Sequence, residues 1–170
     1  KLRAQPFYEG VQVGMQITSL EKRPQYTQLF MFSAVMRNIH RIHYDQTYAQ
    51  FEEHPDVLVQ GPLHGAFLAQ LMTDWIGDDG ILKKISYSNR GRAVPGDVLT
   101  CKGTVTKKYK HAGQHIVECE IWEENQQGQI LTPGSATVIL PSQHAGHLVL
   151  PLFRSTHHFS RLSHGVRRIR

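Results

Sequence analysis

Cysteine, long apolar runs and acidic residues near the C-terminal end are scarce in this 170-residue sequence. Its two cysteines lie in separate strand-like segments, so they favour a reducing compartment and a role as small buried hydrophobes over a disulfide framework. No apolar run approaches the roughly 20 residues that cross a bilayer, and no secretory signal opens the sequence. We expect no membrane partner and a place in the cytoplasm or the mitochondrial matrix. The sequence opens on Lys1 rather than Met, so a removed leader stays an open alternative.

The absence of acidic residues from the last 29 residues accounts for the net charge of +5. Residues 1–141 carry 14 Lys and Arg against 14 Asp and Glu, whereas residues 142–170 hold five arginines and five histidines. A basic tail can contact phosphate but is more often solvated, so no nucleic-acid partner is expected. We predict one domain over residues 1–141 and a basic tail over 142–170, in which only LVLPLF has the apolar content to dock.

The first half of the domain is expected to be rich in helices. Residues 61–77 predict the longest helix, with Pro62 suited to its start and Gly77 to its end. Its apolar residues cover more than one face, so it should be buried nearly all round. Residues 44–54 predict a short helix with Asp45 near its start. Residues 7–20 predict a strand broken by glycines, and residues 25–38 a strand that ends in a helical turn.

From residue 81 onward the apolar period changes from helical to two. Strands are expected within 81–94, 98–110, 114–124 and 130–140, with turns at 95–97, at Ala112-Gly113 and near 125–129. In the third of these strands, Val117, Cys119 and Ile121 face one way and the intervening glutamates the other, which is typical of a half-buried antiparallel strand. One long apolar helix followed by a meander predicts an α+β fold, with the helix wrapped by a curved antiparallel sheet.

The stretch NIHRIHYD, residues 38–45, is the strongest candidate for chemistry. Two histidines three residues apart could be ligands of a metal site, groups for acid/base catalysis, or part of a polar stretch with a structural role only. A zinc site needs a third ligand, and neither cysteine has a suitable spacing, so no metal is expected. Histidine has an unperturbed pKa of about 6.5, which suits proton transfer at neutral pH. A structural histidine is the plain alternative for His43, and Arg41 is expected to form an ion pair with Asp45 or a nearby glutamate.

The element order, the stretch HRIHYDQTYA and the following VQGPLHGAFLAQL resemble the MaoC-like hydratases and dehydratases, which have the hotdog fold. Within them, FSAVMRNIHRIHYD is most similar to the 3-hydroxyacyl-thioester dehydratases and the mesaconyl- and itaconyl-CoA hydratases. The resemblance covers roughly residues 7–141. It implies a cofactor-free hydro-lyase that adds water reversibly across the double bond of an enoyl thioester, carried by coenzyme A or acyl carrier protein. It also implies a homodimer or a hotdog heterodimer.

The resemblance assigns roles to four residues. The family's catalytic histidine falls on His43 and its oxyanion donor on Gly61, whose N–H opens the long helix. The family's aspartate falls on Asn38, an amide that can orient a water but cannot be its base. His40 is the reserve acid/base, and a helix cap alone is the plain alternative for Gly61.

Several further residues are candidates for the substrate pocket. His64 lies one turn into the helix and could line the pocket or have only a structural role next to other polar groups. Lys83, Lys84, Arg90 and Arg92 could hold coenzyme A phosphates or a carrier protein's arm, or form an ordinary solvated face.

Two other functions stay open. The amide at Asn38 fits a non-catalytic hotdog subunit that binds acyl thioesters or completes a partner's site. A thioesterase would need Asp74 as its helix acid, and Asp74 lies near the helix end, far from Gly61, so this class ranks last.

Overall fold

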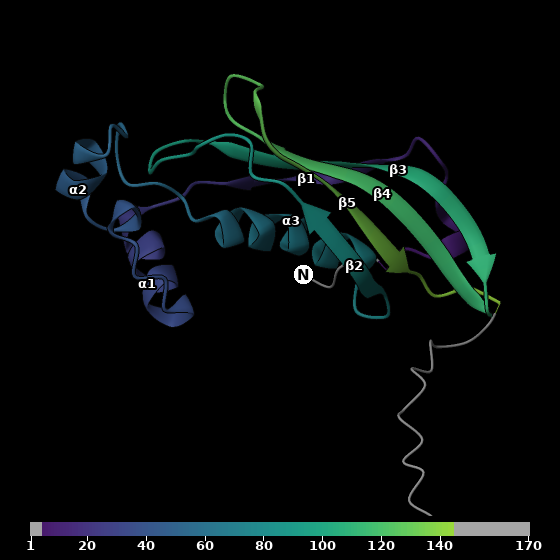
Figure 1. Cartoon of the computed structure of the whole chain (residues 1–170). Coiled ribbons are helices and arrows are strands. Elements are labelled where there is room, and N and C mark those ends of the chain that lie inside the picture. The colour runs from purple at the N-terminus through teal and green to yellow at the C-terminus, as the bar shows by residue number, and fades with distance from the viewer. Residues whose placement is uncertain (1–4, 145–170) are drawn as a thin grey trace, which may run out of the picture.

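Residues 5–144 are described by a computed structural model, and the LVLPLF patch lies outside them. Five strands form one antiparallel sheet in the order β1-β3-β4-β5-β2. The sheet curves along one long helix, and two short helices lie beyond one end of it (Figure 1). The elements are β1 (Gln16–Lys22), α1 (Tyr26–Met36), α2 (Gln46–Phe51), α3 (Gly61–Ile76), β2 (Ile81–Tyr87), β3 (Leu99–His111), β4 (Gln114–Glu124) and β5 (Ile130–Ile139), with the short 3₁₀ turns η1 (Tyr8–Gly10) and η2 (Arg41–His43).

Helix α3 occupies the concave side of the sheet, as the predicted α+β architecture requires. Its apolar side chains join those of β3, β4 and β5 in one core, including Phe67, Leu68, Leu71 and Met72 from the helix. Gly77 ends the helix with a φ of 70°, a conformation that glycine adopts without strain. The prediction of these helix boundaries and of the wrapped α+β fold is confirmed.

Burial of α3 is less complete than its sequence predicts. Leu63 to Ile76 contribute the buried side chains, but one stripe along the helix is exposed in the described chain: Pro62, Ala66, Gln70 and Thr73. These positions follow one another at intervals of three and four, so they share one face. The sheet of the same chain cannot cover both sides of the helix, and this is why that stripe remains uncovered.

The meander follows the predicted turns. Ala112 and Gly113 both have positive φ, 49° and 76°, as a two-residue hairpin between β3 and β4 requires. Along β4 the alternation continues one step beyond the predicted positions, so Glu123 lies on the buried face with Ile121. A fully buried carboxylate needs a partner, and α3 supplies it.

The first helix corrects the predicted strand over residues 25–38. Residues 26–36 form α1 throughout, because the apolar run lacks the alternation of a strand and includes good helix formers such as Leu29, Met31 and Ala34. Only Leu29 and Ser33 of this helix are buried. The predicted helix over residues 44–54 is confirmed as α2, with the Asp45 side chain accepting the Tyr48 N–H at its start. Within residues 5–144 no helix is both long and apolar enough to span a bilayer.

Candidate active site

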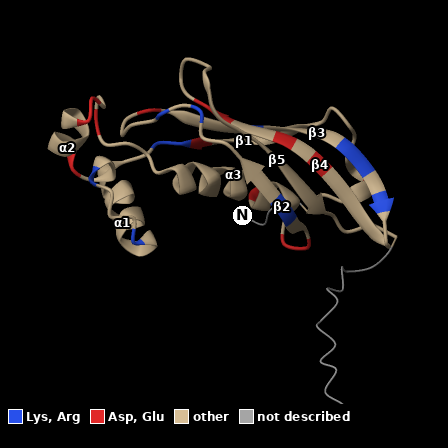
Figure 2. Cartoon of the chain, in the orientation of Figure 1, with Lys and Arg blue, Asp and Glu red and all other residues tan. Residues whose placement is uncertain are grey.

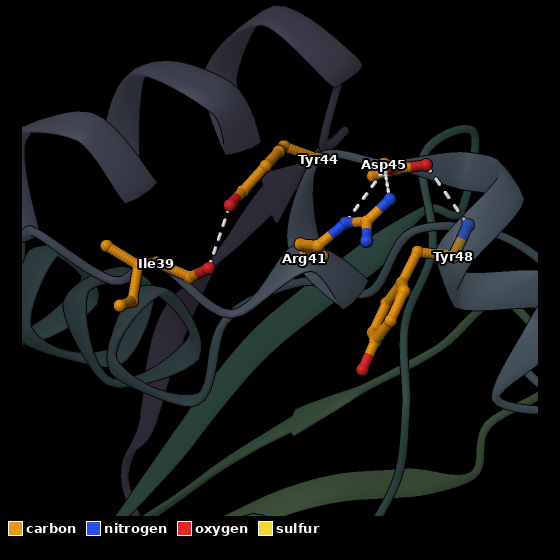
Figure 3. A network of polar contacts seen from close by, with 5 residues as sticks. All are labelled: Ile39, Arg41, Tyr44, Asp45 and Tyr48. Atoms are coloured by element: carbon orange, nitrogen blue, oxygen red, sulfur yellow. Dashed lines mark hydrogen bonds and ion pairs between the residues drawn. The ribbon is translucent and has the colours of Figure 1, made fainter.

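The loop after α1 holds the predicted catalytic residues. Helix α1 ends at Arg37, which has left-handed backbone angles (φ 52°, ψ 34°), and the Asn38 N–H donates to the Ser33 carbonyl at 2.9 Å. The Tyr44 hydroxyl donates to the Ile39 carbonyl at 2.7 Å (Figure 3). These bonds pull the two ends of the loop together, so the segment between them is a compact turn on the end of α1.

A charged pair fixes the other side of this loop. The Arg41 guanidinium donates to Asp45 Oδ2 through Nη2 at 2.6 Å and Nε at 3.1 Å, as Figure 3 shows. Arg41 and the Tyr48 N–H hold the pKa of the Asp45 carboxyl below its usual value. The guanidinium also lies over the Tyr48 ring, 4.5 Å from its centroid. The predicted structural role of Arg41 as an ion-pair partner of Asp45 is confirmed.

His43 has one ring nitrogen fixed by the backbone. Its Nδ1 lies 2.9 Å from the Leu58 carbonyl oxygen, which can only accept, so Nδ1 carries the proton. In the neutral imidazole, Nε2 is then the unprotonated nitrogen and can act as a base. Burial lowers the pKa of His43, against the opposing effect of the Leu58 hydrogen bond, and nearby His40 and His54 lower it further. The neutral, basic form therefore predominates at pH 7.

Asn38 and His40 precede this imidazole in the same loop. The Asn38 Oδ1 accepts the His40 N–H at 3.3 Å, which leaves the two N–H donors of the amide for another acceptor. The His40 ring is exposed, and its centroid lies 6.1 Å from that of His43. If the Asn38 amide donates to a water oxygen, the two protons of that water point away from Asn38, toward other acceptors. Asn38 can therefore orient a water but cannot take its proton.

A short extended strap, residues 57–60, connects this turn to the start of α3. The Leu58 N–H donates to the Ile42 carbonyl at 2.9 Å, and the Val59 N–H donates to the Ala93 carbonyl at 2.9 Å. Leu58 thus binds the histidine turn with both its backbone groups. Gly61 follows three residues later, within about 10 Å along the chain. The strap holds the candidate base and the candidate oxyanion donor at a fixed separation.

Gln60 anchors the strap to α1. Its side chain is fully buried, and its Nε2 donates to the Leu29 carbonyl at 2.7 Å and to Ser33 Oγ at 2.8 Å. The Ser33 carbonyl also accepts the Asn38 N–H. One turn of α1 therefore positions both Asn38 and Gln60, the residue that caps the N-terminus of α3. Sequence reasoning missed Gln60; the signal was a long amide directly before a glycine-opened apolar helix.

The N-terminus of α3 presents a backbone donor. Within residues 5–144 no acceptor is found for the Gly61 N–H, and Pro62 has no N–H, while the next two N–H groups both bond the Gln60 carbonyl. An unpaired N–H at a helix N-terminus favours negative charge in front of it. The Gly61 N–H is therefore an unpaired backbone donor, within residues 5–144, at a position that favours an anion.

Two glycines one turn apart let the end of β2 lie directly on this part of α3. A Cβ on Gly61 would stand 2.4 Å from the Asn89 amide nitrogen, and one on Gly65 would stand 2.1 Å from the Tyr87 ring. Tyr87 and Asn89 are two apart, so both point to the same side of an extended chain. The spacing of Gly61 and Gly65 was the available signal for this close approach, and Asn89 is a polar group beside the donor that sequence reasoning missed.

The four predicted basic residues do not lie together. Arg92 reaches the histidine side of the fold, where its guanidinium lies 3.2 Å from His54 Nδ1, and Arg90 is its near neighbour on the loop. Lys83 lies at the other end of β2, where it donates to Gln114 at 3.0 Å, with Lys84 next to it. Figure 2 shows a further blue run at the far end of β3, away from α1 and α2. Of these four residues, Arg92 is the one whose side chain contacts a group near the candidate site, through His54.

His64 lies in the core rather than on the surface of a pocket. Its Nδ1 is 2.5 Å from Glu123 Oε1, and the two side chains are 3% and 0% exposed. Glu123 Oε2 also lies 3.9 Å from the Cys101 Sγ. Both cysteines are buried, as predicted, and burial raises the pKa of the Cys119 thiol to about 12. His64 and Glu123 join the first turn of α3 to β4.

Metal ligation receives no support from this geometry. Among residues 5–144 no three His, Cys, Asp or Glu side chains are grouped so that they could share an ion. One nitrogen of His43 is already engaged with a carbonyl, which suits an acid/base role at the other nitrogen.

Residues 12–95 match the family model for hydroxyacyl-thioester dehydratase type 2. A 49-residue segment is 51% identical to mesaconyl-C(4)-CoA hydratase of Chloroflexus aurantiacus; it spans 28% of this chain and 18% of that protein.

Solved structures resemble the whole fold. The R-hydratase PhaJ1 of Pseudomonas aeruginosa superposes with a TM-score of 0.70 at 24% identity, over 80% of this chain and 86% of that one. The MaoC-like dehydratase of Rhodospirillum rubrum superposes with a TM-score of 0.71 at 21% identity, over 81% of this chain and 98% of that one. With the dehydratase model covering the loop that carries Asn38 and His43 and the strap that leads to Gly61, the chain belongs to the MaoC-like family of hydratases and dehydratases with the hotdog fold.

Proposed function

We propose that the protein is a cofactor-free hydro-lyase that hydrates an enoyl thioester, or dehydrates the 3-hydroxyacyl thioester, with His43 as its acid/base. The observation that carries the proposal is the Nδ1 hydrogen bond to Leu58, which leaves Nε2 of a half-buried, neutral imidazole as the basic nitrogen. General acid/base catalysis needs such a nitrogen at a pKa near the working pH.

In the hydration direction, His43 Nε2 takes a proton from a water oriented by the Asn38 amide. The water oxygen bonds to the β-carbon, and the electron pair of the double bond moves through the α-carbon onto the thioester oxygen. The Gly61 N–H donates to that oxyanion. The imidazolium then returns its proton to the α-carbon, so one water is added and His43 is regenerated. A single titratable group suffices because the proton it takes is the proton it gives.

Residues 58–61 connect the candidate base to the candidate oxyanion donor and span at most about 10 Å. A thioester oxygen and β-carbon, with a hydrogen bond of about 3 Å at each end, would need about 9–10 Å. For the carrier, Arg92 beside His54, with Arg90 two residues before it, would meet phosphate groups of coenzyme A or of a carrier protein's arm.

Assembly as a homodimer is part of the proposal. Helix α1 is apolar on every side, yet Phe30, Met31, Val35 and Met36 are 54–78% exposed. A helix of that composition is normally covered. The stripe of Pro62, Ala66, Gln70 and Thr73 on α3 is uncovered as well. A second copy, or a related hotdog subunit, that packs on these surfaces would bury both.

The decisive experiment uses purified protein with crotonyl-CoA and mesaconyl-CoA, followed at the enoyl-thioester absorbance. His43→Ala should lower kcat by at least about 10²- to 10⁴-fold with the fold intact by circular dichroism. Asn38→Ala should cost less, and Asn38→Asp should retain turnover with an altered pH profile. Turnover by His43→Ala equal to that of the parent protein would show that His43 is structural.

The second candidate function is a non-catalytic subunit, and the amide at Asn38 is the observation that favours it. Such a subunit would bind the thioester but give no turnover by itself. Binding of crotonyl-CoA without hydration, followed by activity on addition of a catalytic hotdog partner, would select this alternative.

A further inference from the structure

The turn after α2 fixes the backbone that carries a further histidine, His54. The His54 N–H donates to the Ala49 carbonyl at 3.0 Å. The Glu53 N–H donates to the Gln50 carbonyl at 3.1 Å, which completes a Schellman motif. Glu53 takes the left-handed position of this motif, with a φ of 61°. Glycine usually occupies that position, because these angles are costly for a residue with a Cβ, and such strain is common at functional sites.

The His54 ring accepts a hydrogen bond from a cation. Its Nδ1 lies 3.2 Å from Nη1 of Arg92, and a guanidinium can only donate. Nδ1 is therefore unprotonated, and the proton of the imidazole is on Nε2. An imidazolium carries a proton on both nitrogens and could not accept this bond, so Arg92 also keeps His54 neutral.

His43 and His54 thus have opposite tautomers. The Leu58 carbonyl fixes the proton of His43 on Nδ1 and leaves Nε2 as an acceptor. Arg92 fixes the proton of His54 on Nε2 and makes that nitrogen a donor. One imidazole can therefore take a proton, while the other donates a hydrogen bond without a change in its own charge.

The strap of residues 57–60 ties both rings to one region of the fold. Leu58 binds His43 through its carbonyl, and the N–H of the next strap residue donates to the Ala93 carbonyl at 2.9 Å. Ala93 directly follows Arg92, so the partners of the two rings are attached to each other through adjacent strap residues. Burial lowers the pKa of His43 most, and His54 lies close enough to lower it further.

We propose that His54 is a second functional histidine of the site, which donates from Nε2 to the oxygen that is added at, or leaves from, the β-carbon. The inference rests on the proposed hydro-lyase function and adds to it one catalytic residue, with Arg92 as its positioning residue. The water must lie within hydrogen-bond reach of His43 Nε2, so a group near His43 meets the water oxygen rather than the thioester oxygen at Gly61.

A donor in this position stabilises charge without taking part in the proton transfer. As His43 removes a proton from the water, negative charge develops on the water oxygen, and the His54 N–H donates to it. In the dehydration direction, the same donor stabilises the hydroxyl group as it departs. The proton still passes from the water to His43 and from His43 to the α-carbon, and His54 keeps its own proton throughout.

NMR tests the two tautomers without any substrate. Long-range ¹H–¹⁵N spectra of histidine-labelled protein distinguish an imidazole with its proton on Nδ1, one with its proton on Nε2, and an imidazolium. At pH 7 His54 should be neutral with its proton on Nε2, whereas His43 should carry its proton on Nδ1. Arg92→Met removes the donor, so His54 should then show both tautomers. A parent protein whose His54 carries the proton on Nδ1, or is an imidazolium, overturns the inference while the hydro-lyase function stands.

Kinetics test whether this donor takes part in the reaction. His54→Leu should lower kcat for crotonyl-CoA by about 10- to 100-fold, the range that a hydrogen bond to a charged group supplies. His54→Gln keeps an N–H donor and should retain part of the rate. His111→Leu is the matched control, since it removes an exposed imidazole at the far end of β3, and it should turn over like the parent protein. An unchanged kcat in a folded His54→Leu protein would exclude the donor role.

The positioning role of Arg92 has to be separated from a contact with the carrier's phosphates. Crotonyl-pantetheine has no phosphate, so loss of a phosphate contact cannot affect its hydration. Arg92→Met should lower kcat for crotonyl-CoA and kcat/KM for crotonyl-pantetheine, each by about 3- to 10-fold. Arg23→Met removes an exposed guanidinium that pairs with Glu21 and should change neither value. An effect of Arg92→Met confined to the KM of crotonyl-CoA would contradict the positioning role.

The outcomes separate this inference from the proposed function. Circular dichroism checks the fold of each variant, and the NMR result on the parent protein depends on no variant. A parent protein that hydrates neither thioester overturns the proposed function and this inference with it. Hydration by the parent protein, with the wrong tautomer at His54 or no effect of His54→Leu, overturns this inference alone.

Discussion

The buried pair of His64 and Glu123 allows a quantitative prediction about what holds helix α3 in place. Glu123→Ala removes the carboxylate that meets His64 Nδ1 at 2.5 Å, in a position with no exposure to solvent. Breaking a buried pair by removal of one partner typically costs about 3–5 kcal/mol. For a chain of this length, each kcal/mol shifts the melting temperature by about 2–4 °C, so we expect a fall of about 6–20 °C.

Two further variants separate the lost hydrogen bond from the lost volume. Glu123→Gln keeps an oxygen that accepts from His64 Nδ1, so its loss should be about 1 kcal/mol. Replacing both residues by leucine removes the polar groups together, and such replacements are often neutral or stabilising. The double variant should therefore be more stable than Glu123→Ala.

Thermal and urea unfolding followed by circular dichroism measure these differences, and the crotonyl-CoA assay reports on the site. His64 is three residues from Gly61, so a loosened first turn should lower turnover by the Glu123→Ala protein at temperatures where it is folded. A loss of less than about 1 kcal/mol in Glu123→Ala, or a double variant no more stable than that single one, would refute the idea that the pair anchors α3.

Three other expectations follow from the site and the surface. The lowered pKa of His43 places the acid limb of the kcat/KM profile below pH 6.5, because the enzyme needs the neutral imidazole; a limb above that value would contradict the assignment. Gly61→Ala should displace the Asn89 amide, 2.4 Å from the new methyl, and lower kcat/KM with little change in stability, whereas Gly10→Ala enters open space and should change neither. Val35→Lys places a charge on the exposed face of α1, so light scattering should show a shift from dimer to monomer; an unchanged dimer would exclude this face.

The sequence predicts the meander and the long helix because their signals are local. Alternation along β4 and the Ala112-Gly113 turn depend on neighbouring residues only, and so do the start of α3 at Gly61 and its end at Gly77. The strand predicted over residues 25–38 was wrong for a related reason. An apolar run without a period gives no local signal, and the helix-forming residues within it decided the structure.

The candidate site depends on contacts that no local pattern contains. The proton on His43 Nδ1 is fixed by Leu58, 15 residues away, and His64 meets Glu123, 59 residues away. The alternation of β4 places Glu123 on the buried face, so the sequence alone could have indicated a buried carboxylate that needs a hydrogen-bond partner. The pairing of Glu123 with His64 could not be inferred from the sequence, because it depends on the position of α3 along the sheet.

The asparagine at position 38 leaves all proton transfer in the proposed reaction to His43. An amide can orient a water but has no titratable proton, so the pH profile of the parent protein should follow the imidazole alone. Asn38→Asp adds a carboxylate that can itself take a proton from the water. The variant should therefore retain hydration of crotonyl-CoA with an altered pH profile, and a profile identical to that of the parent protein would show that residue 38 takes no part in proton transfer.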